Sequence, residues 1–289
     1  MEGRVDQYAV VGHPVAHSLS PFIHSLFARQ TGQVLSYRLM DVEPEHFNER
    51  VSEFFAAGAR GVNITVPHKG RALSLANELT ERAWRAGAVN TLAARDDGTM
   101  LGDNTDGVGL VQDLVVNLGL TIRQRSILLI GAGGAARGVI APLLALAPQR
   151  VVVANRTAER AVALAAMFEG LGPIEGCGFG ELQSQPFDLI VNATSASLTG
   201  ELPEVPAAAF GPSTFCYDMA YGRGDTPFVR WARGLGCRDA VPGWGMLVEQ
   251  AAESFRLWRG VRPLTAPVLK ALAGGRAGPD GMSGVSASN

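Results

Sequence analysis

The sequence of 289 residues predicts a two-domain α/β protein built around mainly parallel sheets. Short apolar runs of strand length alternate with segments whose apolar residues repeat at helical spacing, which is typical of βα units. Glycine and proline, with 35 and 16 residues, separate these runs along the whole chain. The length fits one large or two moderate domains, since a domain usually has about 100–200 residues.

The composition is that of a globular protein. Hydrophobic residues make up 47% and charged residues 18%, which excludes a mostly disordered chain. The net charge of −2 gives no electrostatic reason to expect a nucleic-acid partner. The amino terminus lacks the basic start of a signal peptide, and glycines interrupt the most apolar stretch, so we expect a cytoplasmic protein outside the membrane. The three cysteines form no CxxC pair, so we expect reduced thiols and no metal site; they are Cys177, Cys216 and Cys237.

The first strand is expected at residues 8–12, and the first helix begins at Ser20. Serine is a good N-cap, and Pro21 is tolerated in the first helical turn. Gly32 is expected to end this helix. The next strand is expected at residues 61–66, where the alternation places Asn63 and Thr65 on one face and the apolar residues on the other.

A helix is expected from Asp106 or Gly107 to Gly119, because the intervening apolar residues keep helical spacing. Further strands are predicted at residues 126–130, 151–154, 187–191 and 214–219, and a last strong helix at 246–258. From Gly274 on, small residues dominate, and a disordered tail is expected at 274–289.

The strand at 127–130 runs into a glycine-rich turn and then a helix, which is the setting of the dinucleotide-binding fingerprint G-x-G-x-x-A. Gly131 permits the tight turn, Gly133 lets a pyrophosphate approach the backbone, and Ala136 allows close packing of helix on sheet. The helix start then offers free N–H groups to the phosphates. The alternative is a purely structural glycine turn.

The end of the following strand indicates which dinucleotide binds. An NAD site usually has Asp or Glu there, for the ribose 2′-hydroxyl. This chain has Asn155, Arg156 and Thr157, with Arg160 one helical turn on. Arginine pairs with phosphate, so the sequence predicts NADP(H). The alternative is that the arginines are solvated charges at a helix start, which suits Arg160 better than Arg156.

A second group of polar residues lies outside the nucleotide region. Ser18 and Ser20 flank a helix start, where a carboxylate would be stabilised; the alternative is that Ser20 serves only as the N-cap. Residues 102–107 place two carboxylates at another helix start, and one of these is expected to be only a cap.

Several motifs, in one collinear order over residues 7 to 272, resemble those of the bacterial shikimate dehydrogenase family. They include Ser-Leu-Ser-Pro at 18–21, Asn-Ile-Thr-Val-Pro-His-Lys at 63–69, Gly-Ala-Val-Asn-Thr at 87–91 and Gly-Asp-Asn-Thr-Asp-Gly at 102–107. The glycine loop and residues 155–157, 192–195, 217–219 and 245–250 also match.

The resemblance implies a substrate-binding domain at residues 1–105, completed by 243–273, and a Rossmann-like NADP-binding domain at 106–242, with the active site in the cleft between them. The implied reaction is the reversible NADPH-dependent reduction of 3-dehydroshikimate to shikimate, in chorismate and aromatic amino-acid biosynthesis. The implied partners are this small-molecule substrate and, at most, a second copy of the chain, so that the protein is a monomer or a homodimer.

By position, the resemblance makes Lys69 and Asp106 the catalytic pair. Because a hydride leaves the alcohol carbon, the hydroxyl must lose a proton, which this pair would handle; which of the two carries it stays open. The implied substrate contacts are Ser18, Ser20 and Tyr221 for the carboxylate, and Asn63, Thr65, Lys69, Asn90, Asp106 and Gln250 for the ring hydroxyls. The implied cofactor contacts are Gly131, Ala132, Gly133, Gly134, Ala135, Asn155, Arg156, Thr157, Arg160 and Thr194, with Met219 and Gly243 bordering the nicotinamide.

The chain departs from the family pattern beside the expected nicotinamide pocket. The family usually reads Asp-Gly-Leu-Gly-Met, whereas this chain has Pro242 and Trp244 in the place of the aspartate and leucine. Proline lacks an N–H, and tryptophan is much larger than leucine. Two other functions therefore stay open: a quinate or divergent shikimate-like dehydrogenase, and, more distantly, a non-catalytic nucleotide-binding protein.

Overall fold

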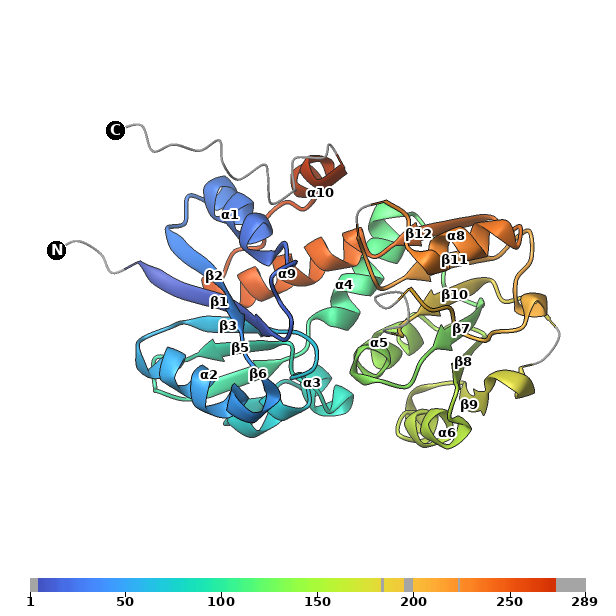
Figure 1. Cartoon of the computed structure of the whole chain (residues 1–289), viewed down its shortest axis with the longest axis horizontal. Helices are drawn as coiled ribbons and strands as arrows, with labels where there is room; N and C mark the ends of the chain where they lie inside the picture. Colours follow the sequence, from blue (N-terminus) through green and yellow to red (C-terminus); the bar gives the residue numbers. More distant parts are fainter. Residues whose placement is uncertain (1–4, 183–184, 195–199, 223, 274–289) are drawn as a thin grey trace. The chain divides into compact units, whose positions relative to one another are not determined.

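The computed structural model describes residues 5–182, 185–194, 200–222 and 224–273 (Figure 1). The tail predicted from Gly274 on lies outside these residues. Of the three cysteines, all free thiols, Cys216 is buried and the other two are half-buried. Within the described residues, no helix is long and apolar enough to cross a membrane, and no group of three or more His, Cys, Asp or Glu is arranged to hold a metal ion.

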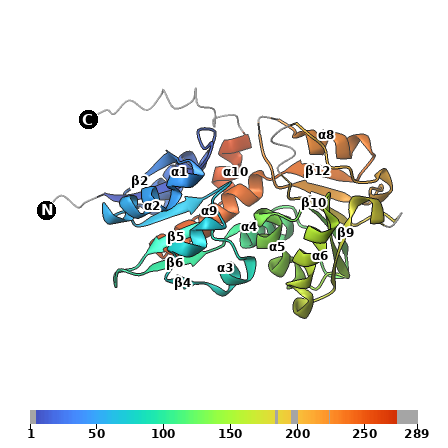
Figure 2. The same cartoon turned by 60° about the horizontal axis from the view of Figure 1, so that its bottom comes forward.

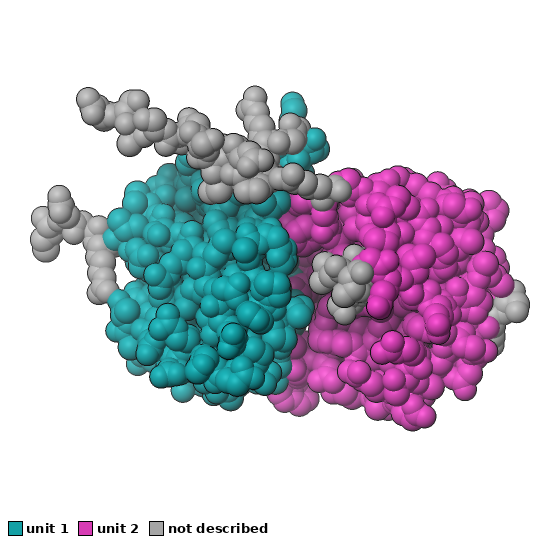
Figure 3. Space-filling model, in the orientation of Figure 1, with its two compact units in different colours: residues 1–80, 89–105, 248–289 teal, residues 81–88, 106–247 magenta. Residues whose placement is uncertain are grey.

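The chain divides into two compact units (Figure 3). Unit 1 comprises the residues up to Thr80, Val89–Thr105 and the residues from Val248 on, and unit 2 comprises Glu81–Ala88 and Asp106–Leu247. One boundary of the long stretch of unit 2 lies between Thr105 and Asp106. The other boundary falls after Leu247, inside a helix, and a short helical segment before Val89 groups with unit 2.

Unit 1 contains a six-stranded mixed sheet in the order β2-β1-β3-β5-β6-β4. β5 runs antiparallel to both of its neighbours, β3 and β6, whereas the other three strand pairs are parallel, so the sheet is mainly parallel, as the sequence predicts, with one reversed strand. The elements are β1 (Asp6–Gly12), α1 (Ser20–Thr31), β2 (Leu35–Asp41), α2 (Phe47–Ala56), β3 (Gly61–Ile64), β4 (Glu78–Leu79), β5 (Thr91–Ala94), β6 (Met100–Asp103), the second part of α9 (Trp244–Arg259) and α10 (Ala266–Ala273).

Helices cover both faces of this sheet (Figure 1). Neighbouring residues of β2 point to opposite faces, as strand geometry requires. The Tyr37 ring stacks on His24 of α1 with ring centroids 4.3 Å apart, whereas the Arg38 guanidinium lies 4.6 Å from the centre of the Phe54 ring of α2. Trp258 of α9 lies on the α1 side, 5.4 Å from His24.

Unit 2 contains a six-stranded, fully parallel sheet in the order β12-β11-β10-β7-β8-β9, as predicted for a dinucleotide-binding domain. Its elements are α3 (Glu81–Ala86), α4 (Asp106–Gln112), a π-helix (Asp113–Asn117), β7 (Ser126–Ile130), α5 (Gly134–Leu144), β8 (Arg150–Asn155), α6 (Ala158–Ala166), β9 (Ile174–Gly178), β10 (Leu189–Asn192), β11 (Phe215–Asp218), α8 (Pro227–Gly234), β12 (Asp239–Pro242) and the start of α9.

Two apolar clusters hold this sheet between its helices (Figure 2). Ile127 and Leu129 of β7 join one cluster, with residues of α4, α5 and α6. Leu128 and Ile130 join the other, with residues of α8. A strand that is buried on both faces has a continuous apolar sequence, and this pattern is what predicts β7.

Two sequence expectations are corrected here. The strand expected at 61–66 ends at Ile64, because Pro67 has no N–H for the ladder and the chain turns, with the His68 N–H donating to the Thr65 carbonyl at 3.0 Å. The helix expected to continue to Gly119 is α-helical only to Gln112. A π-helix follows, and its wider turn shifts the buried face, so that Val115, expected on the apolar face, is exposed.

Candidate active site

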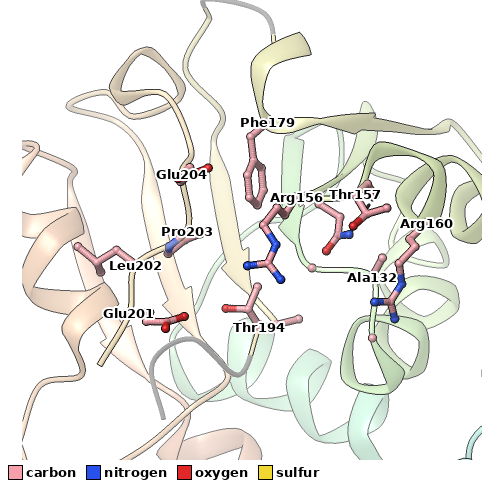
Figure 4. Close-up of a pocket in the computed structure, with 14 residues that line it drawn as sticks. Ala132, Arg156, Thr157, Arg160, Phe179, Thr194, Glu201, Leu202, Pro203 and Glu204 are labelled. Carbon is pink, nitrogen blue, oxygen red and sulfur yellow. Dashed lines mark hydrogen bonds between the residues drawn. The ribbon is translucent and has the colours of Figure 1, made fainter. Parts of the chain in front are cut away.

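A cavity of about 790 Å³ lies at the carboxyl ends of the central strands of unit 2 (Figure 4). Ligands of open parallel α/β sheets bind at this edge. Most of the predicted cofactor residues line the cavity: Gly131, Ala132, Gly133, Asn155, Arg156, Thr157, Arg160 and Thr194. The lining also includes residues that sequence reasoning missed, namely Phe179, Ala193, Glu201, Leu202, Pro203 and Glu204.

The glycine loop between β7 and α5 has the features of a phosphate site. Gly131 has φ +106°, a conformation that side chains disfavour, and a Cβ there would lie 3.1 Å from Thr194 Cγ2. The N-cap residue of α5 is Gly133, which has no side chain to accept its first N–H groups. Gly134 and Ala135 form the first turn and do not line the cavity. The helix start therefore offers N–H donors and a positive dipole end to an anion.

Arg156 and Arg160 follow β8 and are exposed at the cavity wall. Neither guanidinium forms an ion pair with a residue that the structure describes. β8 ends at Asn155, so no carboxylate occupies the position that binds a ribose 2′-hydroxyl in NAD sites. Figure 4 shows Arg156 and the Phe179 ring pointing into the cavity, with Glu201 and Glu204 on its other side. These residues fit a dinucleotide that carries an extra phosphate.

Met219 and Gly243 do not line this cavity but follow β11 and β12, the next strands of the same sheet. The Gly243 N–H donates to the Ala220 carbonyl at 3.0 Å. A Cβ on Gly243 would lie 2.7 Å from the Met219 carbonyl oxygen, so only glycine allows this approach. The predicted cofactor residues thus follow β8, β7, β10, β11 and β12, five successive strands, at one edge of the sheet.

The two departures from the family pattern lie beside Gly243. Pro242 is the last residue of β12, opposite Asp218, and a proline suits this edge strand. Trp244 is the first residue of α9, and its ring lies 5.0 Å from that of Tyr221. Tyr221 is half-buried, and partial desolvation raises its pKa to about 12, so the phenol stays protonated and can donate a hydrogen bond.

In unit 1, three of the predicted hydroxyl-binding residues, Asn63, Asn90 and Gln250, belong to one buried polar network. Tyr37 donates to Asn63 Oδ1 at 2.7 Å, and Asn63 Nδ2 donates to Thr91 Oγ1 at 3.1 Å and to Ser254 Oγ at 2.9 Å. The Ser254 hydroxyl lies 2.8 Å from Thr91 Oγ1 and 3.3 Å from Thr105 Oγ1. Sequence reasoning identified Asn63 here but missed the groups that hold it.

Asn90 is held by the same network. Its Oδ1 accepts from the Thr105 N–H at 2.9 Å and from Thr91 Oγ1 at 2.8 Å, which fixes the amide orientation. Its Nδ2 donates to Thr105 Oγ1 at 2.9 Å and to Gln250 Oε1 at 3.5 Å. The structure therefore brings together Asn63, Asn90 and Gln250, three of the residues predicted to bind ring hydroxyls.

Ser18 and Ser20 lie at the start of α1, with their hydroxyls 3.2 Å apart. The expectation that Ser20 is the N-cap is wrong: Leu19 occupies that position, and Ser20 is the first helical residue. The apolar Leu19 side chain forms no capping hydrogen bond. The Ser20 N–H donates to Ser18 Oγ at 3.3 Å, so both hydroxyls gather at the helix start, where an anion is favoured.

Lys69 is half-buried in the loop after β3, and its carbonyl accepts from the Val89 N–H at 2.8 Å. The preceding His68 anchors this loop: it is fully buried, its Nε2 lies 2.7 Å from the Val42 carbonyl, and its ring stacks on Phe47 at 4.5 Å. Burial lowers the pKa of His68, which keeps it neutral. Thr65, which begins the same loop, is also half-buried.

The carboxylates of residues 102–107 have different environments. Asp103 is fully buried in unit 1, where its Oδ1 accepts from Thr80 Oγ1 at 2.6 Å and from the Asn104 N–H at 2.7 Å. Asp106 is buried as the first residue of α4 in unit 2. The internal bonds of Asp103 make it the structural carboxylate of the pair.

Family models match three parts of the chain. Residues 10–92 match the shikimate dehydrogenase substrate-binding domain, residues 114–201 match shikimate/quinate 5-dehydrogenase, and residues 243–273 match the shikimate 5′-dehydrogenase C-terminal domain. A shikimate dehydrogenase (NADP(+)) of Methylococcus capsulatus is 55% identical over 267 residues, which is 92% of this chain and 96% of that protein.

Solved structures give the same result. The Ael1 enzyme of Pseudomonas putida superposes with a TM-score of 0.85 at 45% identity, covering 92% of this chain and 98% of that one. A Thermus thermophilus shikimate 5-dehydrogenase in complex with NADP(H) and shikimate gives 0.82 at 34% identity, covering 94% of this chain and 100% of that one. With the glycine loop, the arginine pair and the amide network in place, these similarities show that the chain belongs to the shikimate dehydrogenase family.

Proposed function

We propose that this chain catalyses the reversible NADPH-dependent reduction of 3-dehydroshikimate to shikimate, as in chorismate and aromatic amino-acid biosynthesis. The observation that carries the proposal is the cavity of unit 2, where an uncapped helix start and two arginines without ion-pair partners among the described residues meet. The 55% identity to an NADP(+)-dependent shikimate dehydrogenase supports it.

Unit 2 is proposed to bind NADP(H), which supplies the hydride acceptor when shikimate is oxidised. The N–H groups at the start of α5 would hold the pyrophosphate, and Arg156 and Arg160 the 2′-phosphate. Asn155, Thr157 and Thr194 would add hydrogen bonds to the cofactor from the same cavity wall.

Unit 1 is proposed to bind the substrate. Ser18 and Ser20 would hold the substrate carboxylate from the start of α1, and Asn63, Thr65, Asn90 and Gln250 would bind the ring hydroxyls. Because the amides of Asn63 and Asn90 are already oriented by their neighbours, little order is lost when a hydroxyl binds them. Tyr221 of unit 2 would add a donor to the carboxylate.

Lys69 and Asp106 are proposed to handle the hydroxyl proton. As the alcohol is oxidised, the O–H proton passes to this pair while the C–H hydride leaves to the cofactor. The composition of the chain supports lysine as a proton carrier, because of its 25 basic residues only Lys69 and Lys270 are lysines. Arginine does not lose its proton in proteins, whereas lysine can, so a lysine at position 69 suits a group that must exchange one.

We further propose that the protein works in the cytoplasm as a monomer or a homodimer. Its small-molecule chemistry needs no nucleic-acid or membrane partner, and the net charge of −2 gives no electrostatic reason to expect either.

The test is a comparison of initial rates with shikimate or quinate, each with NADP⁺ or NAD⁺. We expect robust turnover with shikimate and NADP⁺ only. Strong use of quinate or NAD⁺ would instead identify a divergent dehydrogenase, with Pro242 and Trp244 as the first residues to revert. An absence of turnover with all four pairs would refute the proposal.

The Lys69→Ala variant tests the proton pair. General acid–base catalysis usually contributes about 10²–10⁴-fold, so kcat should fall by that order while the Kd for NADP⁺ stays unchanged. Lys270→Ala is the matched control, since it removes the other lysine from an exposed position on α10. Near-normal turnover of Lys69→Ala would exclude Lys69 from the proton transfer.

A further inference from the structure

Unit 2 buries a carboxylate and a phenol that the proposed function does not use. Asp113 is 4% exposed and Tyr217 is fully buried. The Tyr217 hydroxyl donates to Asp113 Oδ2 at 2.6 Å, and Asn117 Nδ2 donates to Asp113 Oδ1 at 3.0 Å. A buried carboxylate is costly unless it is well hydrogen-bonded, so this pair needs a reason to exist.

The π-helix that follows α4 provides the carboxylate. Asp113 is the first residue of this wide turn, and Asn117, its hydrogen-bond partner, is the last. Such turns are rare and occur frequently at functional sites. Tyr217 comes from β11, two residues before Met219. The pair thus joins a turn and a strand that are 104 residues apart in the sequence.

The third partner is the first turn of α9. The Met246 N–H donates to the Tyr217 hydroxyl oxygen at 3.2 Å. A Cβ on Gly245 would lie only 1.8 Å from Asp113 Oδ1, so the carboxylate packs directly against the helix backbone. Gly243, which precedes α9, has no side chain to cap it. The pair therefore resembles an N-cap residue, since Tyr217 accepts one N–H of the first turn and Asp113 places a negative charge beside it.

We propose that Asp113 and Tyr217 are positioning residues that fix the segment from Gly243 to Met246 against the end of β11, and so set the wall along which the nicotinamide binds. The inference rests on the proposed function, which places the nicotinamide beside Met219 and Gly243. The Tyr217 phenol links the two segments that carry Met219 and Gly243, because Tyr217 belongs to β11 and its hydroxyl accepts a hydrogen bond from the Met246 N–H of α9.

The chemistry of the pair suits a fixed anchor. Burial and the neighbouring Asp113 carboxylate raise the pKa of Tyr217 well above its usual value, so the phenol stays protonated and keeps donating across the working pH range. Gly245 and Gly243 are both required by close contacts, at 1.8 Å and 2.7 Å for a Cβ, so this backbone has little freedom to shift.

The test separates the two halves of the cofactor. In Tyr217→Phe, the Kd of 2′,5′-ADP, which fills only the adenosine side, should stay within about twofold of wild type. The KM for NADP⁺ should rise about tenfold, or kcat with shikimate fall by that factor. Ser126→Ala is the control: it removes a hydroxyl bonded to Asp188 at 2.9 Å at the amino end of β7, and should lower the melting temperature without changing either constant.

Two outcomes would overturn the inference: kinetics of Tyr217→Phe that match those of Ser126→Ala, or an equal loss of 2′,5′-ADP and NADP⁺ binding. If Tyr217→Phe does not fold, Asp113→Asn, which keeps an acceptor for the phenol, replaces it with the same expectation. If the wild type turns over no substrate, the proposed function fails. In that case, NADPH affinity is measured by cofactor fluorescence and 2′,5′-ADP affinity by competition. A loss of NADPH affinity alone in Tyr217→Phe would still show that the pair positions the wall, and an equal loss of both would refute it.

Discussion

Ser254→Ala tests whether the buried network of unit 1 orients the amides that are proposed to bind the ring hydroxyls. Ser254 is fully buried on α9, and its hydroxyl meets Asn63, Thr91 and Thr105. The variant removes this oxygen but changes little volume. We therefore expect it to weaken both the fold of unit 1 and the hold on the Asn63 amide.

The magnitude follows from what remains after the change. Asn63 Nδ2 keeps Thr91 Oγ1 at 3.1 Å, and Thr91 keeps its donation to Asn90 Oδ1 at 2.8 Å, so no group loses every partner. The cost is then that of about one net hydrogen bond, about 1–1.5 kcal/mol of unfolding free energy, rather than the sum of all contacts. For a chain of this size, that corresponds to about 3 °C in melting temperature.

The KM for shikimate should change together with the free energy of unfolding. A loss of about 1 kcal/mol in the orientation of Asn63 raises the KM for shikimate about threefold to tenfold, while the KM for NADP⁺ is unchanged. The assay is steady-state kinetics beside thermal unfolding. Ser25→Ala is the control, since Ser25 is exposed on α1 and bonds only to the Phe22 carbonyl among the described groups, at 2.7 Å. An unchanged KM for shikimate together with a lowered melting temperature would refute the reasoning, because the network would then support the fold alone.

Three further predictions concern the cofactor, pH and packing. Arg156→Ala should raise the KM for NADP⁺ about tenfold with no effect on that for NAD⁺, since an exposed arginine contributes about 1.5 kcal/mol to a phosphate contact; equal losses for both would contradict this. Burial lowers the pKa of His24 from 6.5 to about 3, so below pH 6.5 only the unfolded state gains a proton. The free energy of unfolding is therefore highest above pH 6.5 and falls by about 1.4 kcal/mol per pH unit as the pH is lowered toward 3. Urea titrations at several pH values should show a smaller fall for His24→Phe than for the wild type. Gly61→Ala should destabilise the protein by about 1–3 kcal/mol in urea, because the new Cβ would lie 2.3 Å from Trp258 Nε1.

The nucleotide half of the fold was predictable because its signals are local. β7 is a continuous apolar run, and Gly131 needs its positive φ within the same turn, so neighbouring residues carry the information. The signal for NADP(H) is equally local, since Arg156 follows β8 at the place where NAD sites have an acidic residue. The short β5 and β6 of unit 1 carry no such pattern, and they escaped prediction, as did the edge strand β2 and helix α2.

The groups that hold the candidate site were not predictable, because they pair across long stretches of chain. Ser254 is 191 residues from Asn63, and Tyr217 is 104 residues from Asp113. Serine, tyrosine and aspartate are common at surfaces, and nothing in their spacing distinguishes these from the rest. The π-helix also disturbed the apparent helical face, because its wide turn breaks the 3.6-residue repeat on which the expectation for Val115 rested.

The division of the chain into units affects the order in which the protein can fold during synthesis. Unit 2 is largely one continuous stretch, whereas unit 1 receives Ser254 and Trp258 from the far end of the chain. At about 5–20 residues per second, the ribosome adds these side chains roughly 8–30 s after the last strand of the unit 1 sheet. During that interval Asn63 and the Leu92 carbonyl lack partners that they have in the finished protein. During synthesis, unit 1 therefore completes its buried network only after α9 has been added, well over 100 residues after the last strand of its sheet.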